Sequence, residues 1–241
     1  MPAVFVHGVP DTSRLWNGIR SRLARKDTVA LSLPGFGCDT PPGFPATKEA
    51  YVDWLIDELA RIGEPVDLVG HDWGANLVQR AVSLRPDLVR TWACGSGIVD
   101  VEYVWHEAAQ HFQTPGMGEQ MMALWEPGLL TDVFVASGLP QGEASAVAHN
   151  IDARMKDCIL KLYRSALEIG AEWQPGVERV TRPALVFWGA DDPYGETRFA
   201  ERLAARVGGQ AIIFPGCKHW WPVERAEEAA AALERFWRAN R

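Results

Sequence analysis

The pentapeptide Gly70-His71-Asp72-Trp73-Gly74 constrains the fold more than any other part of this 241-residue sequence. The apolar residues before it suit the end of a buried strand, and those after it suit the start of a helix. A strand that turns at once into a helix forces its central residue into a strained turn, and flanking glycines give the crowded backbone room. The turn lifts Asp72 to the sheet edge, at a helix N-terminus that favours negative charge. We therefore interpret Asp72 as a nucleophile, because a simple N-cap aspartate requires no such glycines.

Short apolar stretches and amphipathic stretches alternate on both sides of this pentapeptide. Strands are expected at residues 3–6, 28–33, 66–70, 89–94, 185–188 and 210–214, with helices after Thr12 or Ser13 and at 48–62, 75–84, 197–207 and 224–237. In the helix at 48–62, Tyr51, Leu55 and Leu59 recur at the spacing of one helix face. Such alternation predicts an α/β protein with a mostly parallel, doubly wound sheet.

The alternation stops after Gly97 and resumes at Pro183. Residues 98–182 contain helical patterns, at 119–124, 127–137, 141–151 and 155–169, and no clear strand. We therefore expect a core domain made of residues 1–97 and 183–241, with residues 98–182 inserted as a helical cap over the site.

Two further residues follow Asp72 in the chain order that nucleophile-elbow hydrolases use, which is nucleophile, acid and histidine. His219 follows the last expected strand, and we interpret it as the base. Asp191 and Asp192 compete to orient it, and the Gly-x-x-Asp spacing from Gly189 favours Asp192. The earlier His7 is interpreted as a structural residue that ties loops together.

Together these motifs resemble the α/β-hydrolase superfamily, and within it the branch with an aspartate nucleophile, which includes epoxide hydrolases and haloalkane dehalogenases. The resemblance rests on five motifs that span nearly the whole chain: His7–Pro10, Leu33–Gly37, Gly70–Gly74, Gly189–Pro193 and Lys218–Trp220. Members of the family usually carry two edge strands before the first motif, so these strands are absent here or the chain is shortened.

The resemblance implies a two-step reaction through a covalent ester. A carboxylate is already ionised at neutral pH and needs no base to activate it, so Asp72 suits attack on a saturated carbon. His219 would then activate a water that attacks the ester of Asp72. Backbone N–H groups near Val9 and at Trp73 would stabilise the oxyanion. An ordinary esterase or lipase is disfavoured.

The leaving group separates the two family activities, because an epoxide becomes a basic alkoxide that needs a proton. Epoxide hydrolases typically hold two cap tyrosines for this task. The segment around Tyr163 resembles one of them, so Tyr163 is the candidate donor. The second is expected four residues before Phe112, where this sequence has Ala108. Tyr103, His106 and His111 are alternative donors that the sequence does not distinguish.

Haloalkane dehalogenase activity is the alternative, since Trp73 together with Trp105 or Trp125 could bind a halide. Against it, Val9 stands where one dehalogenase subgroup has asparagine. A third hypothesis is a hydrolase fold kept for ligand binding without catalysis. In all three cases the expected ligand is a small apolar organic molecule, with water as co-substrate for the enzymes. The pocket is expected to include Trp105, His106, His111 and Trp220.

Composition excludes several other classes of function. The formal net charge of −7 argues against nucleic acid and anionic membranes as partners, because both require a basic face. No apolar run is long enough to span a bilayer, and no signal peptide is evident. The four cysteines, Cys38, Cys94, Cys158 and Cys217, lack metal-ligand spacing and suit reduced thiols. We therefore expect a cytoplasmic enzyme without metal or cofactor.

Overall fold

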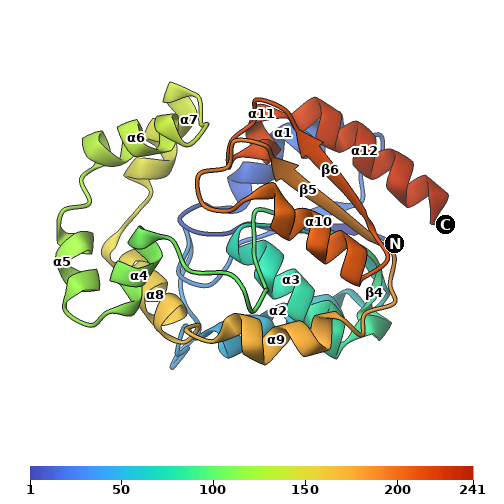
Figure 1. Ribbon diagram of the computed structural model, residues 1–241, viewed down its shortest axis with the longest axis horizontal. Coiled ribbons are helices and arrows are strands. Elements are labelled where there is room, and N and C mark those ends of the chain that lie inside the picture. The colour runs from blue at the N-terminus through green and yellow to red at the C-terminus, as the bar shows by residue number, and fades with distance from the viewer. Residues whose placement is uncertain (241) are drawn as a thin grey trace.

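A six-stranded sheet forms the centre of the protein in the computed structural model, which describes residues 1–240 (Figure 1). Its strands are β1 (Ala3–Val6), β2 (Thr28–Leu31), β3 (Val66–His71), β4 (Val89–Gly95), β5 (Ala184–Gly189) and β6 (Gln210–Phe214). The spatial order is β2-β1-β3-β4-β5-β6, and all five neighbouring pairs run parallel. The carboxyl ends of all six strands therefore meet at one edge, where β3 delivers Asp72.

Helices cover both faces of this sheet because the strands are apolar on both sides. In β1, Val4 and Val6 belong to one buried cluster, whereas Ala3 and Phe5 belong to a second cluster on the opposite face. The helices α2 (Lys48–Ile62), α3 (Trp73–Leu84) and α10 (Thr197–Arg206) cover the first face. The second face is covered by η1 (Ser13–Trp16), α1 (Asn17–Arg22), α11 (Trp221–Glu224) and α12 (Ala226–Ala239). A short 3-10 turn, η2 (Pro86–Leu88), leads into β4. The predicted doubly wound α/β-hydrolase fold is confirmed.

The segment between β4 and β5, all of which the structure describes, contains helices and no strand. These are α4 (Glu107–Gln113), α5 (Met117–Ala123), α6 (Pro127–Ala136), α7 (Gln141–His149), α8 (Ala153–Arg164) and α9 (Ile169–Val177). Figure 1 shows α4 to α8 standing to one side of the sheet, whereas α9 runs beneath it along α3. Residues 98–182, which we call the cap, thus leave the sheet after β4, form a helical layer beside it, and return to it along α9.

Two details of the cap differ from the sequence prediction. The helix expected over residues 155–169 ends early, because α8 stops at Arg164 with Ser165 as its C-cap, and α9, which begins at Ile169, was not predicted. The hydroxyl of Ser165 donates to Leu162 O over 2.7 Å and accepts the backbone N–H of Lys48 over 2.8 Å. The short helix α4 was not predicted, because His106 is an unusual N-cap residue.

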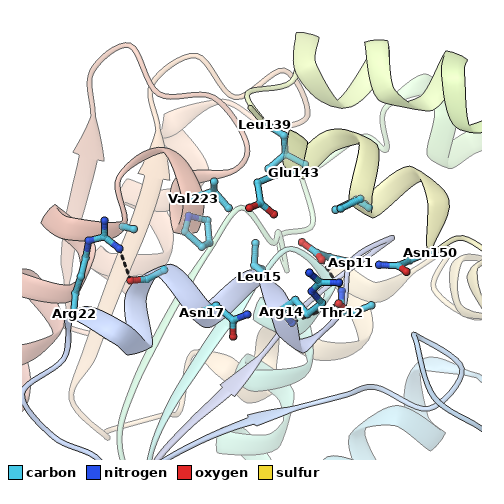
Figure 2. A pocket seen from close by; sticks show the side chains of 15 residues that line it. Asp11, Thr12, Arg14, Leu15, Asn17, Arg22, Leu139, Glu143, Asn150 and Val223 are labelled. Carbon is cyan, nitrogen blue, oxygen red and sulfur yellow. Dashed lines mark hydrogen bonds between the residues drawn. The ribbon is translucent and has the colours of Figure 1, made fainter. Parts of the chain in front are cut away.

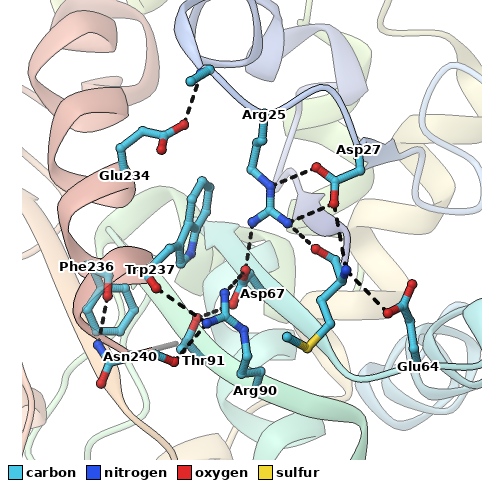
Figure 3. Close-up of polar contacts among 12 residues, drawn as sticks. Arg25, Asp27, Glu64, Asp67, Arg90, Thr91, Glu234, Phe236, Trp237 and Asn240 are labelled. Carbon is cyan, nitrogen blue, oxygen red and sulfur yellow. Dashed lines mark hydrogen bonds and ion pairs between the residues drawn. The ribbon is translucent and has the colours of Figure 1, made fainter.

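The amino end of β3 is fixed by a network of polar contacts (Figure 3). Asp67, which is fully buried, accepts hydrogen bonds from Arg25 Nη1 over 2.7 Å and from Thr91 Oγ1 over 2.6 Å, and it also pairs with Arg90. Arg25 in turn packs over the ring of Trp237. These contacts hold the central strand at the end opposite to Asp72. No helix within residues 1–240 combines the length and the apolar character needed to cross a membrane.

Candidate active site

Asp72 occupies a strained turn between β3 and α3. Its φ of 53° and ψ of −126° lie in a region that side chains rarely adopt, and its backbone N–H donates to Gly95 O over 3.0 Å. A Cβ on Gly70 would lie 2.4 Å from Gly74 O, and one on Gly74 would lie 2.2 Å from Val6 O. Both flanking positions therefore require glycine, as the pentapeptide indicated.

The two carboxylate oxygens of Asp72 have different surroundings. Oδ1 accepts the backbone N–H of Val9 over 2.6 Å, at a point where a Cβ on Gly8 would lie only 2.2 Å from that oxygen. Burial raises the pKa of Asp72 to about 6, although the charge of His219 and the N–H groups of Trp73 and Val9 act in the opposite direction. The charge of His219 and these N–H donors thus partly offset the rise in pKa that burial causes.

His219 lies between two carboxylates. Its Nδ1 is 3.1 Å from Asp192 Oδ2 and 3.2 Å from Asp192 Oδ1, and its Nε2 is 3.8 Å from Asp72 Oδ2. Burial acts to lower the pKa of His219, but Asp192 and Asp72 outweigh it and raise that pKa above its ordinary value. Burial acts to raise the pKa of Asp192, but the charge of His219 and the hydrogen bonds from His219 and the N–H of Tyr194 together outweigh it and lower that pKa. Asp191 is exposed and lies outside this arrangement.

Neighbouring side chains keep the ring of His219 in place. His71 Nε2 lies 2.9 Å from His219 O, and the two rings are 4.8 Å apart. Burial lowers the pKa of His71 to about 3, so His71 is neutral and donates its Nε2–H to that carbonyl. The ring of Tyr194 stands edge-on to His219 at 4.8 Å. His7 has a similar supporting position, since its Nε2 accepts the N–H of Leu33 over 3.0 Å.

Asp72 and His219 open into a cavity of about 350 Å³ beneath the cap. Of the predicted site residues, Val9, His106, Tyr163 and Trp220 also line it. The rest of the lining is almost entirely apolar and consists of Pro10, Ala108, Phe112, Met121, Leu124, Trp125, Leu129, Leu130, Val133, Phe134 and Tyr194. The cavity therefore accepts an apolar molecule next to one carboxylate.

Besides Asp192, which contacts His219, three predicted site residues lie outside this lining. Trp73 is buried, and its side chain stacks on Trp105 with ring centroids 5.9 Å apart, so both indoles belong to the wall behind Tyr163. His111 is half-buried on α4 and does not line the cavity, although Ala108 and Phe112 of the same helix do. Trp105 thus supports Trp73 and Tyr163 from behind, and neither Trp105 nor His111 lines the cavity.

Two phenols line the cavity as potential proton donors, those of Tyr163 and Tyr194. Burial and the charge of Asp72 raise the pKa of Tyr163 well above its usual value, so this phenol stays protonated. Tyr194, which also lines the cavity, was not anticipated from the sequence; its only signal is its place two residues after Asp192. Tyr103 donates its hydroxyl to Tyr194 O over 3.1 Å and lies away from the cavity.

His106 has a defined protonation state. Its Nδ1 accepts the backbone N–H of Ala109 over 3.3 Å at the N-terminus of α4, so the proton of the neutral ring is on Nε2. Burial lowers the pKa of His106 to about 4, with a smaller contribution from the charge of His219. His106 therefore offers an N–H donor to the cavity at neutral pH.

A second cavity of about 190 Å³ lies between α1, α7 and α11 (Figure 2). The carboxylates of Asp11 and Glu143 face it, and burial raises the pKa of Asp11 to about 7. None of Asp72, Asp192 and His219 lines this cavity. The apolar cavity that Asp72 and His219 line is therefore the candidate active site.

Comparison with known proteins agrees with this architecture. A family model described as "Alpha/beta hydrolase family" matches residues 3–232. An epoxide hydrolase from Caballeronia sordidicola is 27% identical over 98% of this chain and 88% of its own length. An (E)-2-((N-methylformamido)methylene)succinate hydrolase from Acinetobacter baylyi is 23% identical over 98% of this chain and 89% of its own.

Among solved structures, the haloalkane dehalogenase DbeA from Bradyrhizobium elkani superimposes with a TM-score of 0.80. The alignment covers 99% of this chain and 91% of DbeA at 22% identity, so this likeness concerns the fold alone. The family match, by contrast, extends over nearly the whole sequence and includes the strands and loops that carry Asp72, Asp192 and His219. The chain therefore belongs to the alpha/beta hydrolase family.

Proposed function

We propose that the protein hydrolyses an epoxide to a vicinal diol through a covalent alkyl ester on Asp72. The observation that carries this proposal is the placement of one carboxylate between two sets of partners. Asp72 Oδ1 accepts the N–H of Val9, and Oδ2 is turned toward His219 at the floor of an apolar cavity. Protonated phenol and imidazole donors line the same cavity.

In the first step, Oδ2 of Asp72 attacks an epoxide carbon, the carbon–oxygen bond of the ring breaks, and an ester forms. The leaving oxygen stays attached to the substrate and takes a proton from the phenol of Tyr163. A carboxylate suits this step because it is a weak base that is already ionised near neutral pH. His106 and Tyr194 are additional donors that can bind the same oxygen.

In the second step, His219 Nε2 removes a proton from water, and the hydroxide attacks the carbonyl carbon of the ester. The negative charge develops on Oδ1, which the N–H groups of Val9 and Trp73 stabilise. Asp192 holds the imidazole through Nδ1 and stabilises the imidazolium that forms. When the intermediate collapses, the bond between the carbonyl carbon and the ester oxygen breaks, and that oxygen leaves with the diol and takes the proton of the imidazolium. The new carboxylic acid of Asp72 gives its proton back to the phenolate of Tyr163, so all three side chains return to their starting states.

The lining of the cavity favours an epoxide over a haloalkane. A halide leaves as a stable anion and needs N–H groups that face the cavity, yet Trp73 and Trp105 are absent from the lining, and the indole of Trp220 donates to Ser137 Oγ over 3.0 Å. Trp125 alone remains of the tryptophans considered for this task. The epoxide hydrolase from Caballeronia sordidicola, similar over nearly its whole length, supports the same choice.

The size and polarity of the cavity support a small, uncharged, apolar substrate with water as the second reactant. A side-by-side assay tests the function. Purified protein is given a styrene-type epoxide and a terminal bromoalkane, and diol and bromide are quantified, with Asp72→Ala as the inactive control. Diol production that Asp72→Ala abolishes supports the proposal. Bromide release without diol would transfer the function to dehalogenation, and no turnover of either substrate would favour a binding role.

A further inference from the structure

Three consecutive residues of the loop that carries His219 each donate a hydrogen bond to the end of α6 in the cap. Lys218 Nζ donates to Ala136 O over 2.7 Å, and the backbone N–H of His219 donates to Ser137 O over 3.2 Å. Trp220 Nε1 donates to Ser137 Oγ over 3.0 Å. Two adjacent cap residues thus bind the whole segment around the base.

Ser137 is well suited to this contact because its hydroxyl is fully engaged. The side chain is buried, and Oγ donates to Phe134 O over 3.1 Å while it accepts the indole N–H of Trp220. The next residue, Gly138, has a φ of +118°, and a Cβ there would lie 2.4 Å from the Glu224 carboxylate. That carboxylate in turn accepts the N–H of Lys218 over 3.1 Å. Cap and loop therefore fit together without spare room.

The core holds the same loop from the other side. His71, next to Asp72, donates its Nε2–H to His219 O. The N–H of His219 is therefore bound by Ser137 of the cap, and its carbonyl by His71 of the core. Between these two attachments the imidazole spans from Asp192 to Asp72. The distance of 3.8 Å from Nε2 to Asp72 Oδ2 therefore depends on both domains and not on the core alone.

We propose that Ser137 is a positioning residue that sets the geometry of His219 relative to Asp72, and that the end of α6 thereby controls ester hydrolysis; this rests on the function proposed above. His219 transfers no proton during alkylation, because the Asp72 carboxylate attacks without a base. Loss of the Ser137 hydroxyl should therefore slow the second step and leave the first step unchanged. A purely structural role would not separate the two steps.

The test compares Ser137→Ala with Ser165→Ala, a closely matched control. Ser165 ends α8 as Ser137 ends α6, and its hydroxyl also donates to the carbonyl three residues earlier. It likewise accepts an N–H group from the core, that of Lys48. Each variant thus removes one cap–core hydrogen bond, but only Ser137→Ala removes one that adjoins His219.

In steady-state assays with a turned-over epoxide, kcat and KM of Ser137→Ala should fall by the same factor, about 10- to 100-fold. A misplacement of 1 Å can cost about 100-fold in rate. Their ratio should stay unchanged, because kcat/KM reports alkylation, and intact-protein mass spectra should show accumulated ester. A loss of folded protein would instead lower kcat alone. Wild-type kcat and KM in Ser137→Ala, or the same pattern in Ser165→Ala, would overturn the proposal.

A second measurement separates this proposal from the proposed function. Crystal structures of the wild type and both variants, without substrate, give the distance from His219 Nε2 to Asp72 Oδ2. A longer distance in Ser137→Ala and an unchanged one in Ser165→Ala support positioning even if no ester ever forms in the wild type. An unchanged distance in Ser137→Ala refutes positioning, whatever the wild type hydrolyses.

Discussion

The backbone N–H of Tyr194 donates a 3.0 Å hydrogen bond to Oδ1 of Asp192, the carboxylate that binds the imidazole of His219. One short turn after β5 therefore fixes both Asp192 and an aromatic ring that stands edge-on to His219. This turn explains why Asp192 faces inward while its neighbour Asp191 remains exposed.

Replacing Asp192 should be far more damaging than replacing Asp191. Without Asp192 the imidazole loses the partner of Nδ1 and can adopt the wrong tautomer, so Asp192→Ala should lower kcat by about 10⁴-fold, as for the orienting acid of serine proteases. Asp191→Ala should change kcat by less than about threefold, since surface substitutions rarely perturb a site. The test is to measure steady-state kcat for both variants after circular dichroism has shown that they are equally folded. A larger loss of kcat in Asp191→Ala would reverse the assignment.

Replacing His219 should stop the reaction after alkylation. In His219→Gln no base remains to activate water, so the ester on Asp72 should accumulate on addition of epoxide. Intact-protein and peptide mass spectra should then show the mass of the substrate added to the peptide that contains Asp72. Asp72→Ala provides the control without an adduct. An absent adduct, with turnover confirmed in the wild type, would contradict covalent catalysis.

The leaving group should determine the effect of removing the phenol at residue 163. Tyr163→Phe should slow alkylation by an epoxide by about 10²–10⁴-fold, the usual contribution of a positioned acid. Release of bromide from a bromoalkane, where the wild type performs it, should change little, because bromide needs no proton. Tyr194→Phe is the comparison, because it also removes only a hydroxyl from the cavity lining. Stopped-flow alkylation rates for the three proteins test this, and full epoxide activity in Tyr163→Phe would assign the proton to His106 or Tyr194.

Alkylation should lose rate in acid because Asp72 must be ionised to attack. Burial raises its pKa to about 6, so the single-turnover alkylation rate should be level above about pH 7 and fall about tenfold per unit below pH 6. The charge of His219 acts to lower this pKa, so the midpoint in His219→Gln should move to higher pH. A midpoint near pH 4 in the wild type would show that the carboxylate is better solvated than this geometry implies.

Removing the carboxylate of Asp67 should lower the free energy of unfolding and leave the catalytic rates of the folded protein unchanged. Asp67→Ala leaves Arg25 and Arg90 without their buried partner, and breaking a buried ion pair typically costs about 3–5 kcal/mol. Both arginines retain some exposure, so we expect about 2–3 kcal/mol. Asp27→Ala, which removes an exposed partner of Arg25, should cost less than about 1 kcal/mol. Urea denaturation measures both, and equal losses would contradict the role of burial.

Much of the fold could be predicted from local sequence. Apolar runs such as Ala3–Val6 and the helical period of Lys48–Ile62 coincide with observed elements, because burial on both faces or on one helix face leaves a clear pattern. The strained turn at Asp72 was also readable, since only glycine fits at Gly70 and Gly74.

Other features depend on tertiary contacts that leave no local pattern. The break after α8 results from the contact of Ser165 with Lys48, and α4 starts from an N-cap histidine. The place of Tyr194 above His219 follows from the turn after β5, and that of Ser137 from the packing of α6 on a loop far away in sequence. Such residues become visible only once the chain is folded.

The cap is inserted in the sequence between β4 and β5. These two strands pair directly in the sheet, although the cap separates Gly95 from Ala184 along the chain. The entropic cost of closing a loop rises only with the logarithm of its length, by about 0.6 kcal/mol for each doubling. Descendants of such a chain can therefore lengthen, shorten or exchange this insertion at little cost to the sheet. Asp72 and the backbone N–H groups that bind it would be inherited unchanged while the range of accepted molecules diversifies.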